Sequence, residues 1–265
     1  MYGKSQWGIV LESLTEPFYL LFLLADFKYG GIQMAYFNMI ELREDEQRKD
    51  DKDYSISFQA HNIIQMFMFF LPKVQIDGSS KISILFEKKT EDKPQYFRSD
   101  YFHISTYYVD ESTLNIANKI SLEEKNEFFL SVIENVLSDI ASKVGNNEVV
   151  DAIHGAADRV REHNYEMILK MEKLSKGSKD RRYKAITYIK INSLGECAYV
   201  EIIDDKKQVQ KVDITEPITF VSLNQIIKKC EWRDHSFVMM NNLGKELVSI
   251  DLSDGNIKVK SVYKR

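Results

Sequence analysis

The sequence predicts an α+β fold made of an N-terminal antiparallel sheet, a long central helical hairpin and a C-terminal β-rich unit. Short segments in the N-terminal and C-terminal parts alternate apolar and polar side chains, which is the pattern of strands. In the middle, apolar residues recur every three or four positions, which is the pattern of helices. We therefore expect a β-rich domain over residues 1–120, a helical hairpin over 121–175 and a second β-rich domain over 183–265.

The composition is that of an ordinary globular protein. The chain has 265 residues, of which 44% are hydrophobic, and its formal net charge is −4. These values exclude intrinsic disorder, and the acidic balance argues against binding nucleic acid over the whole surface. The longest apolar run, Phe18 to Ala25, falls short of the roughly 18 residues that cross a bilayer, so we expect no membrane partner. Cys197 and Cys230 are far apart in the sequence, so we expect reduced thiols and a cytoplasmic location.

Three segments of the N-terminal part predict strands. Residues 54–58 and 81–86 alternate apolar and polar side chains, and residues 97–108 are rich in aromatic and β-branched types. Between Glu41 and Asp53, eleven of the thirteen residues are charged. A segment of this composition cannot bury itself, so we expect an exposed loop between two strands.

Two helices follow in the middle of the chain. Ser121 and Glu124 have the spacing of a capping box, and Gly145 to Asn147 end the first helix and begin the second. The second helix carries an apolar seam at coiled-coil spacing with one polar position, Asn164. The apolar members are Val150, Ile153, Ala157, Val160, Met167, Met171 and Leu174. Two arrangements are open: the seam packs within a monomer, or the helix over residues 147–175 pairs with a second copy in a homodimer.

The C-terminal unit follows a polar linker over residues 176–182. Its β-branched and alternating segments, separated by turn residues, predict six strands interrupted by one short helix. The strands are expected at Ala185–Ile191, Ala198–Ile203, Val209–Ile214, Phe237–Met240, Leu247–Leu252 and Ile257–Tyr263, and the helix at Leu223–Lys229.

One candidate catalytic site brackets the strand predicted at residues 81–86. Asp77 precedes this strand, and Glu87 and Lys89 follow it. Two carboxylates can hold Mg²⁺, which polarises a phosphate, and a lysine can orient the attacking water. The arrangement resembles the D…E-x-K pattern of the PD-(D/E)xK nuclease superfamily, with Ile76 where that pattern has proline. The resemblance implies Asp77 and Glu87 as metal ligands and Lys89 as the catalytic lysine; the alternative is a solvated strand end.

A candidate metal site lies on the second helix. Asp151, His154 and Asp158 are spaced so that they share one helix face. Carboxylates and an imidazole at these offsets can share a divalent metal in a helical bundle. The first helix would have to complete the site, from Glu127, Glu134 and Asp139. The alternative is an ordinary solvated helix face.

The sequence has no phosphate-binding glycine loop, no G-x-S-x-G elbow and no H-E-x-x-H zinc motif. We therefore expect a non-catalytic module without a cofactor that binds another protein, and the Mg²⁺-dependent nuclease is the alternative. The lysine, asparagine and isoleucine usage is typical of a bacterial or phage protein, which favours a toxin-neutralising (immunity-type) or phage or defence accessory role. The candidate binding residues are acids that would attract a basic effector: Glu44, Asp45, Glu46, Asp50, Asp51 and Asp53.

Overall fold

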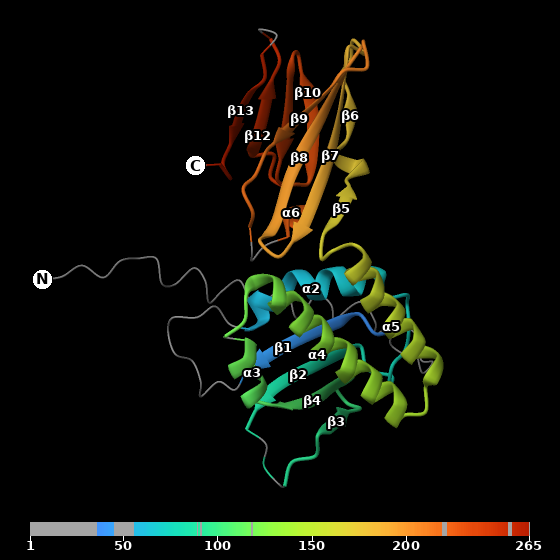
Figure 1. The fold of residues 1–265 in the computed structure, drawn as a ribbon. Coiled ribbons are helices and arrows are strands. Elements are labelled where there is room, and N and C mark those ends of the chain that lie inside the picture. Colours follow the sequence, from blue (N-terminus) through green and yellow to red (C-terminus); the bar gives the residue numbers. More distant parts are fainter. Residues whose placement is uncertain are drawn as a thin grey trace, which may run out of the picture. The chain divides into compact units, whose positions relative to one another are not determined.

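The N-terminal part of the computed structural model is a four-stranded sheet accompanied by helices (Figure 1). The structure describes residues 36–44, 56–88, 90, 92–117, 119–218, 222–253 and 256–264. The first elements in chain order are β1 (Met39–Glu44), α2 (Ile56–Phe70), β2 (Lys81–Glu87), β3 (Tyr96–Ser99) and β4 (Ile104–Asp110). The α+β class expected from the sequence is confirmed.

The N-terminal sheet is mixed rather than antiparallel. Its strand order is β1-β2-β4-β3, in which β1, β2 and β4 run parallel to one another and β3 runs antiparallel to β4. Parallel neighbours need a crossover that returns the chain to the same end of the sheet, and α2 lies in the connection between β1 and β2. The prediction of a wholly antiparallel sheet was therefore wrong in direction, although the predicted strand at residues 81–86 is confirmed as β2.

Helix α2 replaces a strand that the sequence predicted over residues 54–58. From Ile56 onwards this segment is helical, and residues 54 and 55 lie outside the described part. The buried positions Ile56, Ala60, Ile63 and Phe67 follow each other in steps of four, three and four, which is the helical period. The alternation at residues 54–58 is too short to outweigh this longer apolar stripe.

The helical hairpin is shorter than predicted. It comprises α4 (Leu122–Lys143), preceded by the short α3 (Ser112–Ala117), and α5 (Asn147–Glu162) (Figure 1). The capping box is confirmed, because the Ser121 hydroxyl accepts from the Glu124 amide while the Glu124 carboxylate accepts from the Ser121 amide. The second helix was predicted to continue to residue 175, which is wrong: Asn164 and Tyr165 have φ values of 50° and 55°, which end the helix.

The C-terminal part consists of two antiparallel sheets. One has the order β5-β7-β8-β9 with β6 also paired to β7, and the other has the order β10-β11-β12-β13. The elements are β5 (Met167–Lys170), a 3₁₀ helix η2 (Glu172–Leu174), β6 (Lys176–Gly177), β7 (Tyr183–Asn192), β8 (Gly195–Asp204), β9 (Val209–Asp213), α6 (Leu223–Ile226), β10 (Lys229–Arg233), β11 (Ser236–Met240), β12 (Glu246–Asp251) and β13 (Lys258–Ser261). All six predicted strands are present, and β10 begins where the predicted helix was expected to end.

Residues 35–265 form one compact unit, with an apolar core that draws on helices and sheets of both parts. Helix α2 contacts the first C-terminal sheet through polar side chains: the Asn62 amide donates to the carbonyl of Asn192 at 2.8 Å, and the Gln65 amide donates to Glu196 at 2.8 Å. Both cysteines are free thiols. No helix in the described ranges is long and apolar enough to cross a membrane.

Candidate functional site

Asp77 is a buried carboxylate at the entry to β2. The residue is only 6% exposed. Its carboxylate accepts hydrogen bonds from the backbone amide of Ser79 at 2.9 Å and from the Tyr96 hydroxyl at 2.6 Å. The Ser105 hydroxyl donates a third hydrogen bond to the same carboxylate. These donors come from the β2 entry loop, β3 and β4, so Asp77 joins three consecutive segments of the sheet.

The charge of Asp77 is stabilised by these donors. Burial alone would raise the pKa of Asp77, but the hydrogen bonds from Ser105, Tyr96 and Ser79 together hold it below its ordinary value. The backbone carbonyl of Asp77 also accepts from the guanidinium of Arg98 on β3. Asp77 is therefore an ionised structural anchor for the β3–β4 hairpin.

The structure does not bring Asp77 and Glu87 together. Asp77 precedes β2 and Glu87 is its last residue, and a seven-residue strand spans about 20 Å. The carboxylate of Glu87 forms an ion pair with Lys93, and Lys89 lies outside the described residues. The convergence of two carboxylates that the nuclease alternative requires is thus not found, because Asp77 lies before the first residue of β2 and Glu87 lies at the opposite end of the same strand.

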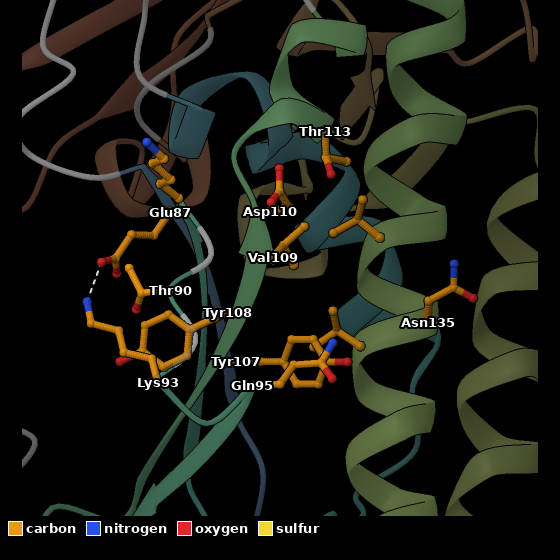
Figure 2. Close-up of a pocket in the computed structure, with 13 residues that line it drawn as sticks. Glu87, Thr90, Lys93, Gln95, Tyr107, Tyr108, Val109, Asp110, Thr113 and Asn135 are labelled. Carbon is orange, nitrogen blue, oxygen red and sulfur yellow. Dashed lines mark hydrogen bonds and ion pairs between the residues drawn. The ribbon is translucent and has the colours of Figure 1, made fainter.

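A pocket of about 380 Å³ lies beside Glu87 (Figure 2). Glu87 and Asp110 are paired in register at the carboxyl ends of the parallel strands β2 and β4. Figure 2 shows the Glu87–Lys93 ion pair at one side of this pocket and Asn135 of α4 at the other. Carboxyl ends of parallel strands are common places for ligand sites, and this pocket lies at such an edge of the sheet. Sequence reasoning missed Asp110, and the available signal was its position at the end of a segment rich in β-branched and aromatic residues.

The candidate metal site on the second helix is occupied by an arginine. Arg161 of α5 donates to Glu127 at 2.9 Å and to Glu134 at 2.7 Å, both on α4, and to Asp158 at 3.3 Å. His154 contacts the second oxygen of Glu134 at 2.6 Å. Asp151 is exposed. Within the described ranges, no group of three or more His, Cys, Asp or Glu side chains is placed to hold a metal ion.

The arginine cluster is an ion-pair network that fastens α5 to α4. Hydrogen bonds lower the pKa of Glu127 to about 2, with the largest contribution from Arg161, followed by Tyr165 and Ser131. They outweigh the effect of burial, which raises this pKa. A guanidinium supplies several donors in a planar fork, which suits it to bridging carboxylates on a neighbouring helix. The first-helix acid Asp139 lies outside this cluster and accepts from Tyr107 at 2.7 Å.

Exposed aromatic side chains gather at the turn between β3 and β4. Tyr101 is 87% exposed and Phe102 is 67% exposed, and their rings meet edge to face with centroids 4.9 Å apart. Phe97 on β3 is 55% exposed. We call residues 100–103 the aromatic turn. Sequence reasoning missed it, because residues 97–108 were interpreted as a single strand.

The aromatic turn is fastened at both ends. On its β3 side, Tyr96 and Arg98 bind Asp77 as described above. On its β4 side, His103 adopts a φ of 50°, and its carbonyl accepts from the Ser80 amide at 2.9 Å. The turn therefore presents its two exposed rings from a fixed backbone.

The acidic candidate binding residues lie almost wholly outside the described part. Only Glu44 is placed, half-buried at the end of β1; Asp45, Glu46, Asp50, Asp51 and Asp53 are in residues 45–55, which the structure does not describe. The start of the charged segment is a strand rather than a loop, since Glu41 to Glu44 belong to β1 and Leu42 is fully buried.

Comparison with protein-family models, with curated proteins and with solved structures finds no match to this chain.

Proposed function

We propose that this chain is a protein-binding module whose partner docks on the aromatic turn. The observation that carries the proposal is the exposure of Tyr101 and Phe102, at 87% and 67%, next to each other on one turn. Aromatic side chains are enriched in the centres of protein interfaces, where they fill pockets of the partner. Adjacent exposed rings on a soluble surface cost free energy in water unless a partner covers them.

The fixed backbone of the aromatic turn supports the same proposal. The Asp77 carboxylate and the Ser80 amide bind the two sides of the hairpin, so its backbone is ordered before any partner arrives. Binding therefore costs less conformational entropy than it would for a flexible loop. Beside the rings, Arg98 and Asp100 form an ion pair with atoms 2.8 Å apart, which supplies a polar rim to an apolar centre.

A photo-crosslinking experiment tests this function. A benzophenone amino acid replaces Tyr101, the protein is irradiated in extract of its native host, and crosslinked proteins are identified by mass spectrometry. The same label at Leu243, which is 92% exposed in a different turn, is the matched control. We expect one protein to crosslink at position 101 and not at 243, and to be lost from affinity capture by a Tyr101→Ser/Phe102→Ser variant. Equal capture by the variant and the wild type would refute the proposal.

We propose further that the partner is a basic effector that this chain holds inactive, as immunity-type or defence accessory proteins do. The acids between Glu44 and Asp53 support this, because concentrated negative charge accelerates association with a basic surface. Once the partner is identified, we expect its association rate to fall steeply with salt and to fall when the six acids are changed to Ser or Gln. An association rate insensitive to both would remove the effector proposal and leave binding at the aromatic turn untouched.

A further inference from the structure

A second pocket, of about 610 Å³, lies between the end of α2 and the first C-terminal sheet. We call it the Glu196 pocket. Its volume is within the range of sites for small organic ligands. Its walls are mainly apolar and include Met68, Leu71, Met167, Leu169, Ile189 and Ile191.

Glu196 on β8 contributes a buried carboxylate to this apolar pocket. The residue is 2% exposed. One carboxylate oxygen accepts from the Gln65 side-chain amide at 2.8 Å, and the other accepts from the backbone amide of Leu223 at 2.7 Å. A carboxylate has about four lone-pair sites, so two neutral donors leave capacity for more.

No cation of the described chain neutralises this carboxylate. No ion pair within the described ranges includes Glu196, and Lys73, the one cationic side chain among the described lining residues, is exposed. Burial lowers the pKa of nearby His61, against the opposing pull of Glu196, so the imidazole stays neutral at pH 7. Burying a carboxylate without a cationic partner is costly, and a bound cation would remove that cost.

Gln65 adds an unused acceptor on the same lining. Its side-chain nitrogen donates to Glu196, but its Oε1 atom is buried and has no hydrogen-bond partner. A buried acceptor left without a donor costs roughly 1–3 kcal/mol. The residues that line the pocket therefore include a buried carboxylate and a buried amide oxygen, both acceptors, among apolar side chains.

We propose that the Glu196 pocket binds a small organic ammonium ion that carries an apolar body. An ammonium group has three donors and no acceptor, which matches Glu196 and the Oε1 atom of Gln65. Hydrogen bonds between charged partners are stronger than neutral ones, and the apolar body gains free energy against the methionine, leucine and isoleucine side chains. This site is separate from the aromatic turn and does not depend on the proposed protein partner.

Calorimetric titration with a matched pair of ligands tests the site. Phenethylamine is an ammonium ion at pH 7, and 2-phenylethanol has the same apolar body with a neutral hydroxyl group. We expect the full chain to bind phenethylamine at least about tenfold more tightly than the alcohol, which corresponds to about 1.4 kcal/mol. In Glu196→Gln this preference should disappear, whereas Glu148→Gln, which changes an exposed glutamate off the pocket lining, should keep it.

A second variant locates binding independently of the charge. Leu169→Trp fills the pocket from β5 and should abolish binding of both ligands, with thermal unfolding as the check on folding. If Glu196→Gln does not fold, two results still test the proposal. These are the preference of the wild type for phenethylamine over 2-phenylethanol and the loss of binding in Leu169→Trp. Equal affinity of the wild type for the two ligands, no binding of phenethylamine, or unchanged binding in Leu169→Trp would each overturn the proposal.

Discussion

The hydroxyl of Tyr96 lies 2.6 Å from Oδ2 of Asp77, and this hydrogen bond joins the first residue of β3 to the loop that enters β2. The same loop binds the end of the aromatic turn through Ser80 and the carbonyl of His103. Asp77, which was predicted from the sequence as a candidate metal ligand, thus has a structural role. Its partners Tyr96 and Ser105 flank the aromatic turn that is proposed to bind a partner.

We expect Asp77→Ala to destabilise the protein by about 3 kcal/mol, because it leaves the donors of Ser79, Tyr96 and Ser105 without their acceptor. Chemical denaturation measures this change. The control is Glu87→Ala, which removes only an ion pair with a half-exposed Lys93 and should cost no more than about 1 kcal/mol. A Mg²⁺-dependent nuclease activity that both substitutions abolish would instead support the nuclease alternative.

Stability should fall in acid as Glu127 becomes protonated. Its pKa is lowered from 4.5 to about 2 in the folded protein, chiefly by Arg161. A depressed folded pKa means that the stabilisation is complete above about pH 4.5 and is lost as the pH falls towards 2. We expect Glu127→Gln to have a flatter dependence of unfolding free energy on pH over this range than the wild type. An identical slope in the two proteins would contradict the assignment.

Arg161→Met should destabilise the helical hairpin by about 1–3 kcal/mol, since Glu127 and the more buried Glu134 lose their cationic partner. Arg159→Met is the matched control, because Arg159 is exposed on the same helix. Thermal and urea unfolding compare the two variants. If Mn²⁺ or Zn²⁺ raises the melting temperature of the wild type, and His154→Ala removes that rise, the metal alternative gains support instead.

Substitutions of Asn164 distinguish a helix that ends at this residue from a coiled-coil helix that continues through it. In the structure its φ is 50°, a left-handed conformation that a β-branched residue adopts only with strain. We therefore expect Asn164→Val to cost about 1–2 kcal/mol and Asn164→Gly to be nearly neutral. A dimeric seam would give the opposite order, because replacing its polar residue with valine stabilises a coiled coil. Light scattering of both variants, beside unfolding, reports the oligomeric state.

Local patterns in the sequence predicted much of the fold. The capping box at Ser121 and Glu124 depends on residues three positions apart. The β7–β8 hairpin depends on a turn between two long segments rich in β-branched residues. Gly195 at that turn has a φ of 130°, and a Cβ there would lie 2.6 Å from the carbonyl oxygen of Ile218. The capping box and the hairpin turn each depend on residues that are close together in the sequence, so they can be predicted from the sequence alone.

The features that prediction missed depend on contacts between distant segments or on unmarked turns. The apolar period of the second helix runs on through Met167 and Leu174, and both are buried, but they lie beyond the left-handed Asn164 and Tyr165. The aromatic turn contains neither glycine nor proline, and Asp100 alone is a weak turn signal, so residues 97–108 were interpreted as one strand. Likewise, Glu196 and Gln65 are 131 positions apart, and their pairing follows only from the folded chain.

The mixture of strand directions has a consequence for the order of folding. Strands β7 and β8 are antiparallel and joined by a two-residue turn, so their pairing closes a very short loop. Strands β1 and β2 are parallel, and the connection between them includes all of α2. Their pairing therefore closes a much longer loop, which makes it slower. We expect amides of β7 and β8 to gain protection in pulsed hydrogen exchange before those of β1 and β2, which would leave the β1 edge exposed to solvent and to other chains while the full chain refolds.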